Sequence, residues 1–225
     1  MIHDVVVAGA GPAGATAAYF LARGGKRVAL LEKATFPRDK RCGDAWCEPA
    51  LEILEEMGVL RELEAEGLVQ WVRAGGLVSP SGLSFTSPDE GIRPSAPRVA
   101  AIKRMVCDER IARAARRVGA ELIEGAAVRD ATLDGSLWNV RCKDGRRFQA
   151  RCLIAADGAK SKIARALGLV TSGANSVASR QYIKGGTHDF TSDGVLLYPP
   201  YAIHGYVSFF SHTNGDIDIG SYLLP

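Results

Sequence analysis

The chain has 225 residues, 47% of them hydrophobic and 24% charged, which is typical of a globular protein with a buried core. A net charge of +3 with scattered basic residues excludes an extended nucleic-acid-binding surface. The uncharged stretch 5–22 is rich in glycine and alanine and contains Pro12, so it suits neither a membrane span nor a signal peptide. The five irregularly spaced cysteines predict no disulfide or zinc framework and indicate a cytoplasmic location.

The N-terminal residues follow the order strand, glycine-rich turn, helix and second strand. The apolar run 5–7 is typical of a buried parallel strand, and residues 15–23 form a helix of small residues. Gly24-Gly25 ends this helix, and the run RVALLE returns as a second strand that ends at Glu32.

The turn GAGPAG has the spacing G-x-G-x-x-G, in which each glycine has a mechanical role. Gly9 permits the tight turn, Gly11 lets the backbone approach a pyrophosphate, and Gly14 lets the helix pack close to the strand. The helix N-terminus then presents its N–H groups to that phosphate. Glu32 follows Gly14 by 18 residues, close to the distance at which an acid accepts ribose hydroxyls. A glycine-rich helix entry without a ligand is the alternative, but the combination predicts a dinucleotide site.

Further elements follow in chain order. Residues 48–67 predict a helical segment divided at Gly58, and residues 69–87 predict a hairpin with its turn at 79–82. The proline- and serine-rich run 87–97 predicts a loop that crosses between two domains.

The second half alternates between helix and strand signals. Residues 102–118 predict a helix, followed by a short strand that reaches Val128. Residues 131–158 predict a three-stranded meander with Asp-Gly turns at 134–135 and 144–145. A helix at 161–168, a polar linker at 171–179 and a β-rich tail at 180–225 complete the expected elements.

Four segments together resemble the FAD-dependent oxidoreductases of the p-hydroxybenzoate hydroxylase fold: GAGPAG, LLEK, the helix with Arg104, and AADGAKSKIARALG. Within that group, FPRDKRCG resembles the proline-basic-Cys-Gly segment of the geranylgeranyl reductase family. The resemblance covers nearly the whole chain and implies an α/β fold. It implies a Rossmann-like FAD-binding domain of residues 1–72 and 98–170, and a β-rich substrate-domain portion of residues 73–97 and 171–225.

The resemblance also implies a set of cofactor-binding residues: Gly9, Gly11, Ala13, Gly14, Glu32, Lys33, Cys42, Gly43, Arg104, Val128, Asp157 and Gly158. The glycine-rich turn would line the FAD pyrophosphate, and Glu32 would hold the adenosine ribose. Arg104 would reach the phosphates or the ribityl chain, for which a guanidinium is well shaped. Val128 would offer backbone contacts to the adenine, and Asp157-Gly158 would close on the pyrophosphate. Asp157-Gly158 could instead be an ordinary turn.

Cys42 is the one catalytic candidate, in a loop laid against the flavin. A thiolate at this place would be stabilised by Lys40 and Arg41. A small residue chosen only for its fit in a surface loop stays open as the alternative.

The remaining histidines and cysteines predict no further site and no metal. The four histidines (3, 188, 204 and 212) show no ligand spacing, and the other four cysteines (47, 107, 142 and 152) are expected to pack as small apolar residues.

Two departures from the family pattern concern the C-terminal part. The later Gly-Asp segment that binds the ribityl chain is missing, since Gly215-Asp216 lies in a turn, so the C-terminal part of the flavin site is expected to be absent. The family's G-Y-x-W-x-F-P becomes GYVSFFS, with Ser208 and Ser211 in place of Trp and Pro. Tyr206 and Phe210 of this segment are expected to contact substrate, and isoprenoid specificity stays open.

The resemblance implies an FAD-dependent oxidoreductase that reduces carbon–carbon double bonds of an isoprenoid by hydride transfer from reduced flavin, with NAD(P)H as an electron donor. A flavin monooxygenase or halogenase and a truncated, non-catalytic flavin-binding module are the alternatives. The expected partners are a small-molecule or lipid substrate and the electron donor, without nucleic acid. A lipid substrate would bring the protein to a membrane surface as a peripheral protein.

Overall fold

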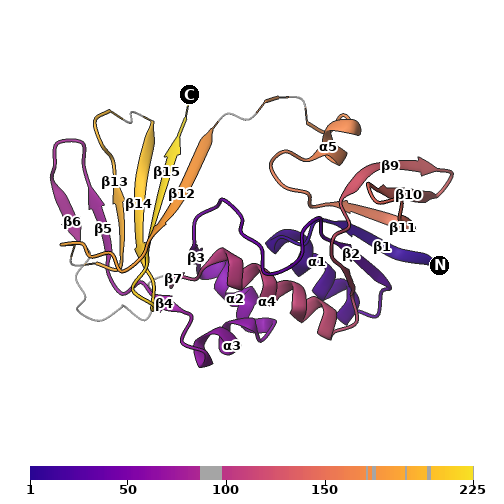
Figure 1. Ribbon diagram of the computed structural model, residues 1–225, viewed down its shortest axis with the longest axis horizontal. Helices are drawn as coiled ribbons and strands as arrows, with labels where there is room; N and C mark the ends of the chain where they lie inside the picture. The colour runs from indigo at the N-terminus through magenta and orange to yellow at the C-terminus, as the bar shows by residue number, and fades with distance from the viewer. Residues whose placement is uncertain (87–97, 171, 174–175, 191, 202–203, 225) are drawn as a thin grey trace. The chain divides into compact units, whose positions relative to one another are not determined.

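The structure is a computed structural model that describes residues 1–86, 98–170, 172–173, 176–190, 192–201 and 204–224. The chain forms two compact units, residues 1–38 with 108–173 and residues 39–107 with 174–225 (Figure 1). The units differ from the expected domains at residues 39–72 and 98–107, which belong to the second unit, and at 172–173, which belong to the first. The division into a cofactor and a substrate domain remains a prediction. The expected crossing loop at 87–97 lies outside the described residues.

The first unit is built on a six-stranded sheet in the order β8-β2-β1-β11-β10-β9. The strands β8, β2, β1 and β11 run parallel, and β11, β10 and β9 continue as an antiparallel meander. The bounds are β1 Ile2–Ala8, β2 Val28–Leu31, β8 Glu121–Ile123, β9 Val128–Asp134, β10 Leu137–Cys142 and β11 Arg147–Ala155. Three helices accompany this sheet: α1 Pro12–Arg23, α4 Arg104–Arg117, whose first turn belongs to the second unit, and α5 Lys162–Ala166.

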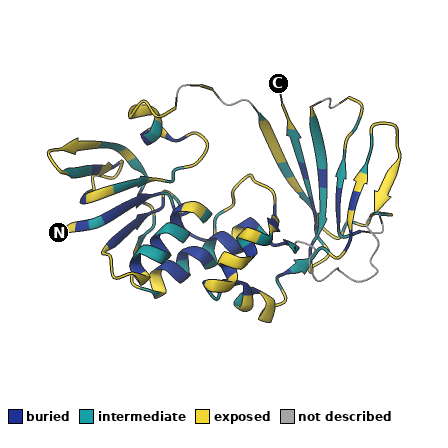
Figure 2. Cartoon of the chain, turned by 180° about the vertical axis from the view of Figure 1, so that it is seen from behind, coloured by how far each residue is buried: buried dark blue, intermediate teal, exposed yellow. Residues whose placement is uncertain are grey.

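The core of the first unit lies where α1 packs against β1 and β2. Figure 2 shows both strands almost entirely buried, and Val6, Val7 and Leu30 are fully excluded from solvent. Burial on both faces explains the unbroken apolar runs of these parallel strands. Small residues of α1, such as Ala15 and Ala18, allow the helix to approach the sheet closely.

The second unit contains two sheets and two helices. The larger sheet has the order β12-β15-β14-β13-β5-β6, and the smaller has the order β3-β7-β4. The larger sheet comprises β5 Gly75–Val78, β6 Ser84–Thr86, β12 Val177–Ile183, β13 Gly194–Leu197, β14 Gly205–Ser211 and β15 Ile217–Leu223. The smaller sheet comprises β3 Ala45–Cys47, β4 Gln70–Trp71 and β7 Val99–Ala101, and the helices are α2 Glu48–Glu56 and α3 Val59–Ala65.

Most of the expected elements are confirmed. Gly58 separates α2 from α3 with a φ of 73°, and Gly135 and Gly145 form the expected turns of the meander with positive φ. The expectation that one strand reaches Val128 is wrong, because β8 ends at Ile123 and Val128 begins β9. Among the described helices, none combines the length and the apolar character needed to cross a membrane. The expected α/β fold with a β-rich second part is confirmed.

Candidate functional site

The carboxyl ends of the parallel strands gather the first group of candidate residues. Gly9 directly follows β1, Glu32 directly follows β2, and Asp157 comes two residues after β11. The chain passes from β1 to β2 on one side and returns later to β11 on the other side. This reversal next to β1 is the switch point at which open α/β sheets bind ligands.

Gly9 and Gly14 are required by the close approach of the backbone at this point. Gly9 has a φ of 103°, and a Cβ on it would lie 2.3 Å from the carbonyl oxygen of Ala156. A Cβ on Gly14 would lie 1.9 Å from the carbonyl oxygen of Gly9. Both distances are far below van der Waals contact, so only glycine fits at either position.

The N-terminus of α1 is left uncapped by side chains. Gly11 is the N-cap residue, Pro12 opens the first turn, and no side chain in the described part of the chain bonds to the free N–H groups of this end. Ala13 in this turn is exposed. An uncapped helix end with exposed N–H groups is a ready site for an anion such as a pyrophosphate. The turn and the helix end therefore fit the phosphates of a dinucleotide.

Glu32 is buried beside the glycine-rich turn and organises it. Its Oε2 accepts a hydrogen bond of 3.1 Å from the N–H of Ala10, and its Oε1 accepts one of 3.1 Å from the N–H of Ala34. An ionised carboxylate has about four acceptor positions, so room for a hydroxyl donor remains. The neighbouring Lys33 is exposed. A ribose contact at Glu32 remains a proposal.

Arg38 is a partly buried residue of this site, with a side chain 12% exposed, that the sequence did not single out. Its Nη1 lies 2.8 Å from Oδ2 of Asp108, and its Nη2 donates to the carbonyl oxygen of Ala10 at 3.2 Å. Nη2 also lies 3.5 Å from Oε2 of Glu32. Arg38 is therefore the residue of FPRDKRCGD that ties this segment to the glycine-rich turn. Within a run of three basic residues, the sequence carries no signal that separates it from its neighbours.

Asp157 caps helix α5. Its carboxylate accepts hydrogen bonds from the hydroxyl of Ser161 and, at 2.8 Å, from the N–H of Lys162. Ser161 is the N-cap residue, and its Oγ accepts from the N–H of Ala164 at 3.0 Å. The structural role of Asp157 is thus in place, and its contact with a pyrophosphate, like that of Gly158, remains a proposal.

Val128 lies at the start of β9, close to Glu32. The N–H of Ala126, two residues earlier, donates to the backbone carbonyl of Glu32 at 2.7 Å. The structure thus places the predicted adenine contact next to the predicted ribose contact.

Cys42, Gly43 and Arg104 belong to the second unit. Cys42 and Gly43 are exposed, and Nη1 of Arg180 donates to the carbonyl oxygen of Cys42 at 3.0 Å. Arg104 is buried, and its guanidinium lies 5.5 Å from the centre of the Trp46 ring. The structure supports an ordered but accessible loop at Cys42.

One face of the larger sheet in the second unit carries the predicted substrate residues. Tyr206 is the cross-strand partner of Tyr222, with ring centres 5.5 Å apart, and its ring lies 6.2 Å from that of Tyr198. Residues that lie directly opposite each other on neighbouring strands point to the same face of the sheet. The strand pairing therefore places four residues of this face in one row across the strands: Ser208, Leu196, Leu77 and Phe85. We call the following set the aromatic face: Leu77, Phe85, Leu196, Tyr198, Tyr206, Phe210 and Tyr222. Leu77 and Phe85 are 45% and 63% exposed, so this face offers apolar surface to a ligand.

A buried polar group lies on the same side of this sheet. It consists of Asp44, Arg180, Tyr182, His212 and Asp218. One carboxylate oxygen of Asp44, one ring nitrogen of His212 and one carboxylate oxygen of Asp218 all lie within 4.8 Å of one another. The sequence missed this group, and His212 was expected to have a structural or surface role only. No spacing rule joins residues from a loop and three strands.

The edge of parallel strands with its glycine-rich turn, uncapped helix and buried acid defines a dinucleotide-binding α/β fold. A family model described as FAD binding domain matches residues 3–195, and the chain belongs to this family, whose cofactor is FAD.

Several curated relatives are similar to the chain. Conditioned medium factor receptor 1 of Dictyostelium discoideum is 42% identical over 100% of this chain and 46% of its own length. Menaquinone reductase of Mycobacterium tuberculosis is 35% identical over 96% of this chain and 54% of its own length. Digeranylgeranylglycerophospholipid reductase of Methanocaldococcus jannaschii is 31% identical over 75% of this chain and 41% of its own length. The chain thus spans about half the length of the relatives it matches.

Solved structures confirm the fold. A geranylgeranyl bacteriochlorophyll reductase-like protein of Thermoplasma acidophilum matches with a TM-score of 0.79 and 20% identity, over 99% of this chain and 57% of its own. The myxobacterial chondrochloren halogenase, an FAD-dependent enzyme, matches with a TM-score of 0.79 and 21% identity, over 99% of this chain and 53% of its own. At these identities the likeness concerns the fold alone.

Proposed function

We propose that the protein is an FAD-dependent reductase that saturates carbon–carbon double bonds in the isoprenoid chain of a lipid or quinone. The observation that carries this proposal is the aromatic face, an accessible apolar sheet surface in the same unit as the Cys42 loop. An isoprenoid chain is long and apolar, and it gains most from a surface of this kind. The names of two reductase relatives, one for a quinone and one for a geranylgeranyl lipid, support the same substrate class.

In this proposal the cofactor and the chain divide the chemistry. Bound FAD, once reduced, supplies the hydride, while the chain binds the cofactor, orients the substrate and excludes water. The glycine-rich turn and the uncapped end of α1 hold the phosphates, and Glu32 holds the ribose. The aromatic face aligns the isoprenoid chain, and the Cys42 loop lies against the flavin.

The test is a single-turnover reaction without oxygen. The protein is purified with its FAD, reduced with dithionite, and mixed with menaquinone or with a digeranylgeranyl lipid. We expect reoxidation of the flavin, seen by absorbance, together with a product that is heavier by two hydrogen atoms in mass spectrometry and stays so after exposure to air, which returns a quinol to the quinone but leaves a saturated isoprenoid chain unchanged. If neither substrate reoxidises the flavin, and an aromatic substrate reacts only when oxygen is present, the protein is a monooxygenase or halogenase instead.

Variants of the aromatic face sharpen this test. Tyr206→Ala should raise the KM for the isoprenoid substrate by about tenfold or more, because it removes a stacked ring from the face. Tyr201→Ala is the matched control, since Tyr201 is 88% exposed and belongs to none of the strands that form this face. Equal KM values for the two variants would exclude the aromatic face as the substrate surface.

A further inference from the structure

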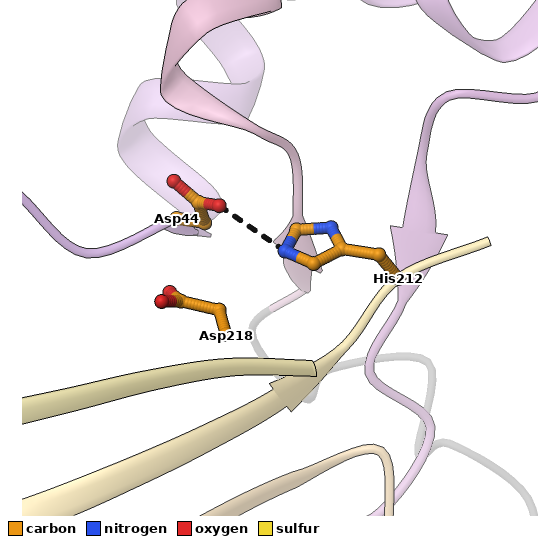
Figure 3. A group of neighbouring side chains, drawn as sticks. All are labelled: Asp44, His212 and Asp218. Carbon is orange, nitrogen blue, oxygen red and sulfur yellow. Dashed lines mark ion pairs between the residues drawn. The ribbon is translucent and has the colours of Figure 1, made fainter. Parts of the chain in front are cut away.

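The buried polar group of the second unit contains two carboxyl groups in very different surroundings. Asp44 and Asp218 are both fully excluded from solvent, and His212 is 7% exposed. Figure 3 shows Asp44, His212 and Asp218 close together, with the ring of His212 directed toward Asp44. Nε2 of His212 lies 3.1 Å from Oδ2 of Asp44, but without the angles of a hydrogen bond.

Asp44 has a full set of partners. Its Oδ1 accepts from Nη1 of Arg180 at 2.9 Å and from the N–H of Arg104 at 3.0 Å, and its Oδ2 accepts from the hydroxyl of Tyr182 at 2.5 Å. Burial alone would raise the pKa of Asp44, but His212, Tyr182, the N–H of Arg104 and the charge of Arg180 together lower it below its usual range. Asp44 is therefore the ionised member of the pair.

Asp218 has none of these partners. Neither of its oxygens makes a hydrogen bond among the described residues, although both are buried. A buried carboxylate without donors is strongly disfavoured relative to its protonated form. Burial, and then the charge of Asp44, raise the pKa of Asp218 to about 6. Arg180, His212 and the backbone N–H of Asp44, which lies near Asp218 without hydrogen-bond geometry, oppose this rise and do not cancel it.

The charge balance of the group favours one proton over a divalent cation. Two carboxylates and the guanidinium of Arg180 leave one negative charge when His212 is neutral. A single proton makes the group neutral, whereas a divalent ion would leave a buried positive charge and compete with Arg180 for Asp44. Outside the group, Lys103 pairs with Asp216. Asp39 also contacts Arg180, but its side chain is 57% exposed, so solvent balances most of the charge of Asp39 and the guanidinium charge remains available to the buried carboxyl groups.

The position of Asp218 connects it to the aromatic face. Asp218 on β15 is the direct cross-strand partner of Phe210 on β14 and of Tyr182 on β12. The acid therefore adjoins the row of residues that we expect to contact the isoprenoid chain. Reduction of a carbon–carbon double bond consumes one proton for each hydride, so a proton source is needed close to this face.

We propose that Asp218 holds a proton in mildly acidic solution and supplies it, through His212, for the reduction of the double bond. This inference rests on the proposed reductase function. The O–H bond of Asp218 breaks as an N–H bond forms at one ring nitrogen of His212, and the N–H bond at the other ring nitrogen breaks as a C–H bond forms. The electron pair of this C–H bond comes from the double bond, and the second hydrogen arrives as hydride from the reduced cofactor. The alkene is reduced, the cofactor is oxidised, and solvent returns the proton to Asp218. Asp218 acts through His212, so it is a positioning residue rather than a catalytic one.

Infrared titration of the FAD-loaded protein tests where the proton lies, independently of turnover. We expect the C=O band of a protonated carboxyl group to titrate near pH 6 in the wild type, and to be absent in Asp218→Asn. Asp144→Asn is the control, because Asp144 is exposed and paired with Arg146, and it should keep the band. Absence of the band in the wild type, its survival in Asp218→Asn, or stoichiometric binding of Mn²⁺ or Zn²⁺ at this group would overturn the proposal.

Single-turnover kinetics then test the proton supply. We expect Asp218→Asn to keep bound FAD, to react about a hundredfold more slowly with the isoprenoid substrate, and to lose the fall in rate above pH 6. An unchanged rate and pH profile would overturn the proton supply. If Asp218→Asn does not fold, His212→Gln should slow the reaction similarly, and an unchanged rate in that variant would count against the relay. If the wild type does not react with any isoprenoid, the reductase function fails, while the infrared band still decides whether Asp218 is protonated.

Discussion

Arg38 and Asp108 form a buried ion pair in which Nη1 and Oδ2 lie 2.8 Å apart, with side chains 12% and 0% exposed. The same guanidinium reaches the backbone of the glycine-rich turn and the carboxylate of Glu32. The charged segment FPRDKRCGD is thus anchored at Arg38, while Cys42 in the same segment remains exposed. This arrangement couples the loop after β2 to the turn on which the phosphates of FAD are expected to bind.

Arg38→Ala should therefore lower both stability and cofactor affinity. The variant leaves the carboxylates of Asp108 and Glu32 buried without their guanidinium, and breaking a buried pair in this way typically costs about 3–5 kcal/mol. Urea unfolding followed by tryptophan fluorescence measures the free energy of unfolding. Arg129→Ala is the control, because Arg129 is 60% exposed in its pair with Asp130, and an exposed pair contributes about 1 kcal/mol or less. Equal losses in the two variants would contradict the anchoring role of Arg38.

Gly14→Ala should weaken FAD binding by a steric effect. The added methyl group would lie 1.9 Å from the carbonyl oxygen of Gly9, so α1 must move away from the turn. We expect a loss of about 1–3 kcal/mol in unfolding free energy from overpacking, and about tenfold or more in FAD affinity measured by flavin fluorescence. Gly75→Ala should be nearly neutral, because a Cβ there meets no atom within 4 Å. Wild-type FAD affinity in Gly14→Ala would show that the turn does not bind the cofactor.

The local elements could be predicted from the sequence because their signals are local. The valine run of β1, the glycine spacing before α1 and the Asp-Gly turns of the meander each act within a few residues. The packing roles of Gly9 and Gly14, the tight turn and the close approach of helix to strand, could also be predicted, because only a close backbone approach requires glycine at this spacing. The fold class and a dinucleotide site follow from these elements together, and FAD follows from the resemblance to the flavoprotein family.

The rest of the site depends on contacts between distant residues. Asp44 and Arg180 are 136 positions apart, and no periodicity or motif links an aspartate in a charged loop to an arginine in a β-rich tail. His212 and Asp218 enter the same group only because antiparallel pairing of β14 and β15 brings the two strand ends together. The burial of Arg38 likewise follows from its contact with α4, a helix 70 residues later.

Thiol labelling can locate the Cys42 loop relative to the flavin. Cys42, Cys47 and Cys152 are exposed, while Cys107 and Cys142 are buried. Ellman's reagent should therefore label three thiols in the native, FAD-free protein and five after unfolding. Saturation with FAD should slow the labelling of Cys42 and leave Cys152 unchanged, as mass spectrometry of the labelled peptides would show. Labelling of Cys42 at one rate with and without FAD would place the loop away from the cofactor.

The stability of the protein should depend on pH through the two buried aspartates, with opposite signs. The pKa of Asp44 is lowered in the folded state, so its contribution is present above its unfolded value of 3.8 and is lost as the pH falls. The pKa of Asp218 is raised from 3.8 to about 6, so its contribution is present below 3.8 and is lost as the pH rises through 6. The full shift corresponds to about 3 kcal/mol of unfolding free energy, most of which is lost between pH 4 and pH 7.

Asp218→Asn should remove the second of these contributions. From pH 4 to pH 7 the wild type should therefore lose unfolding free energy relative to Asp218→Asn. The prediction concerns this change with pH and does not depend on which protein is more stable at pH 4. Urea unfolding at several pH values, followed through Trp46 and Trp71 of the same unit, measures this slope. Asp144→Asn should show no such rise, because Arg146 lowers the pKa of Asp144, and the contribution of Asp144 is lost only as the pH falls below its unfolded value of 3.8. A flat difference for Asp218→Asn across this range would mean that Asp218 is ionised in the folded protein, and that its charge is balanced by a protonated His212 or a bound cation.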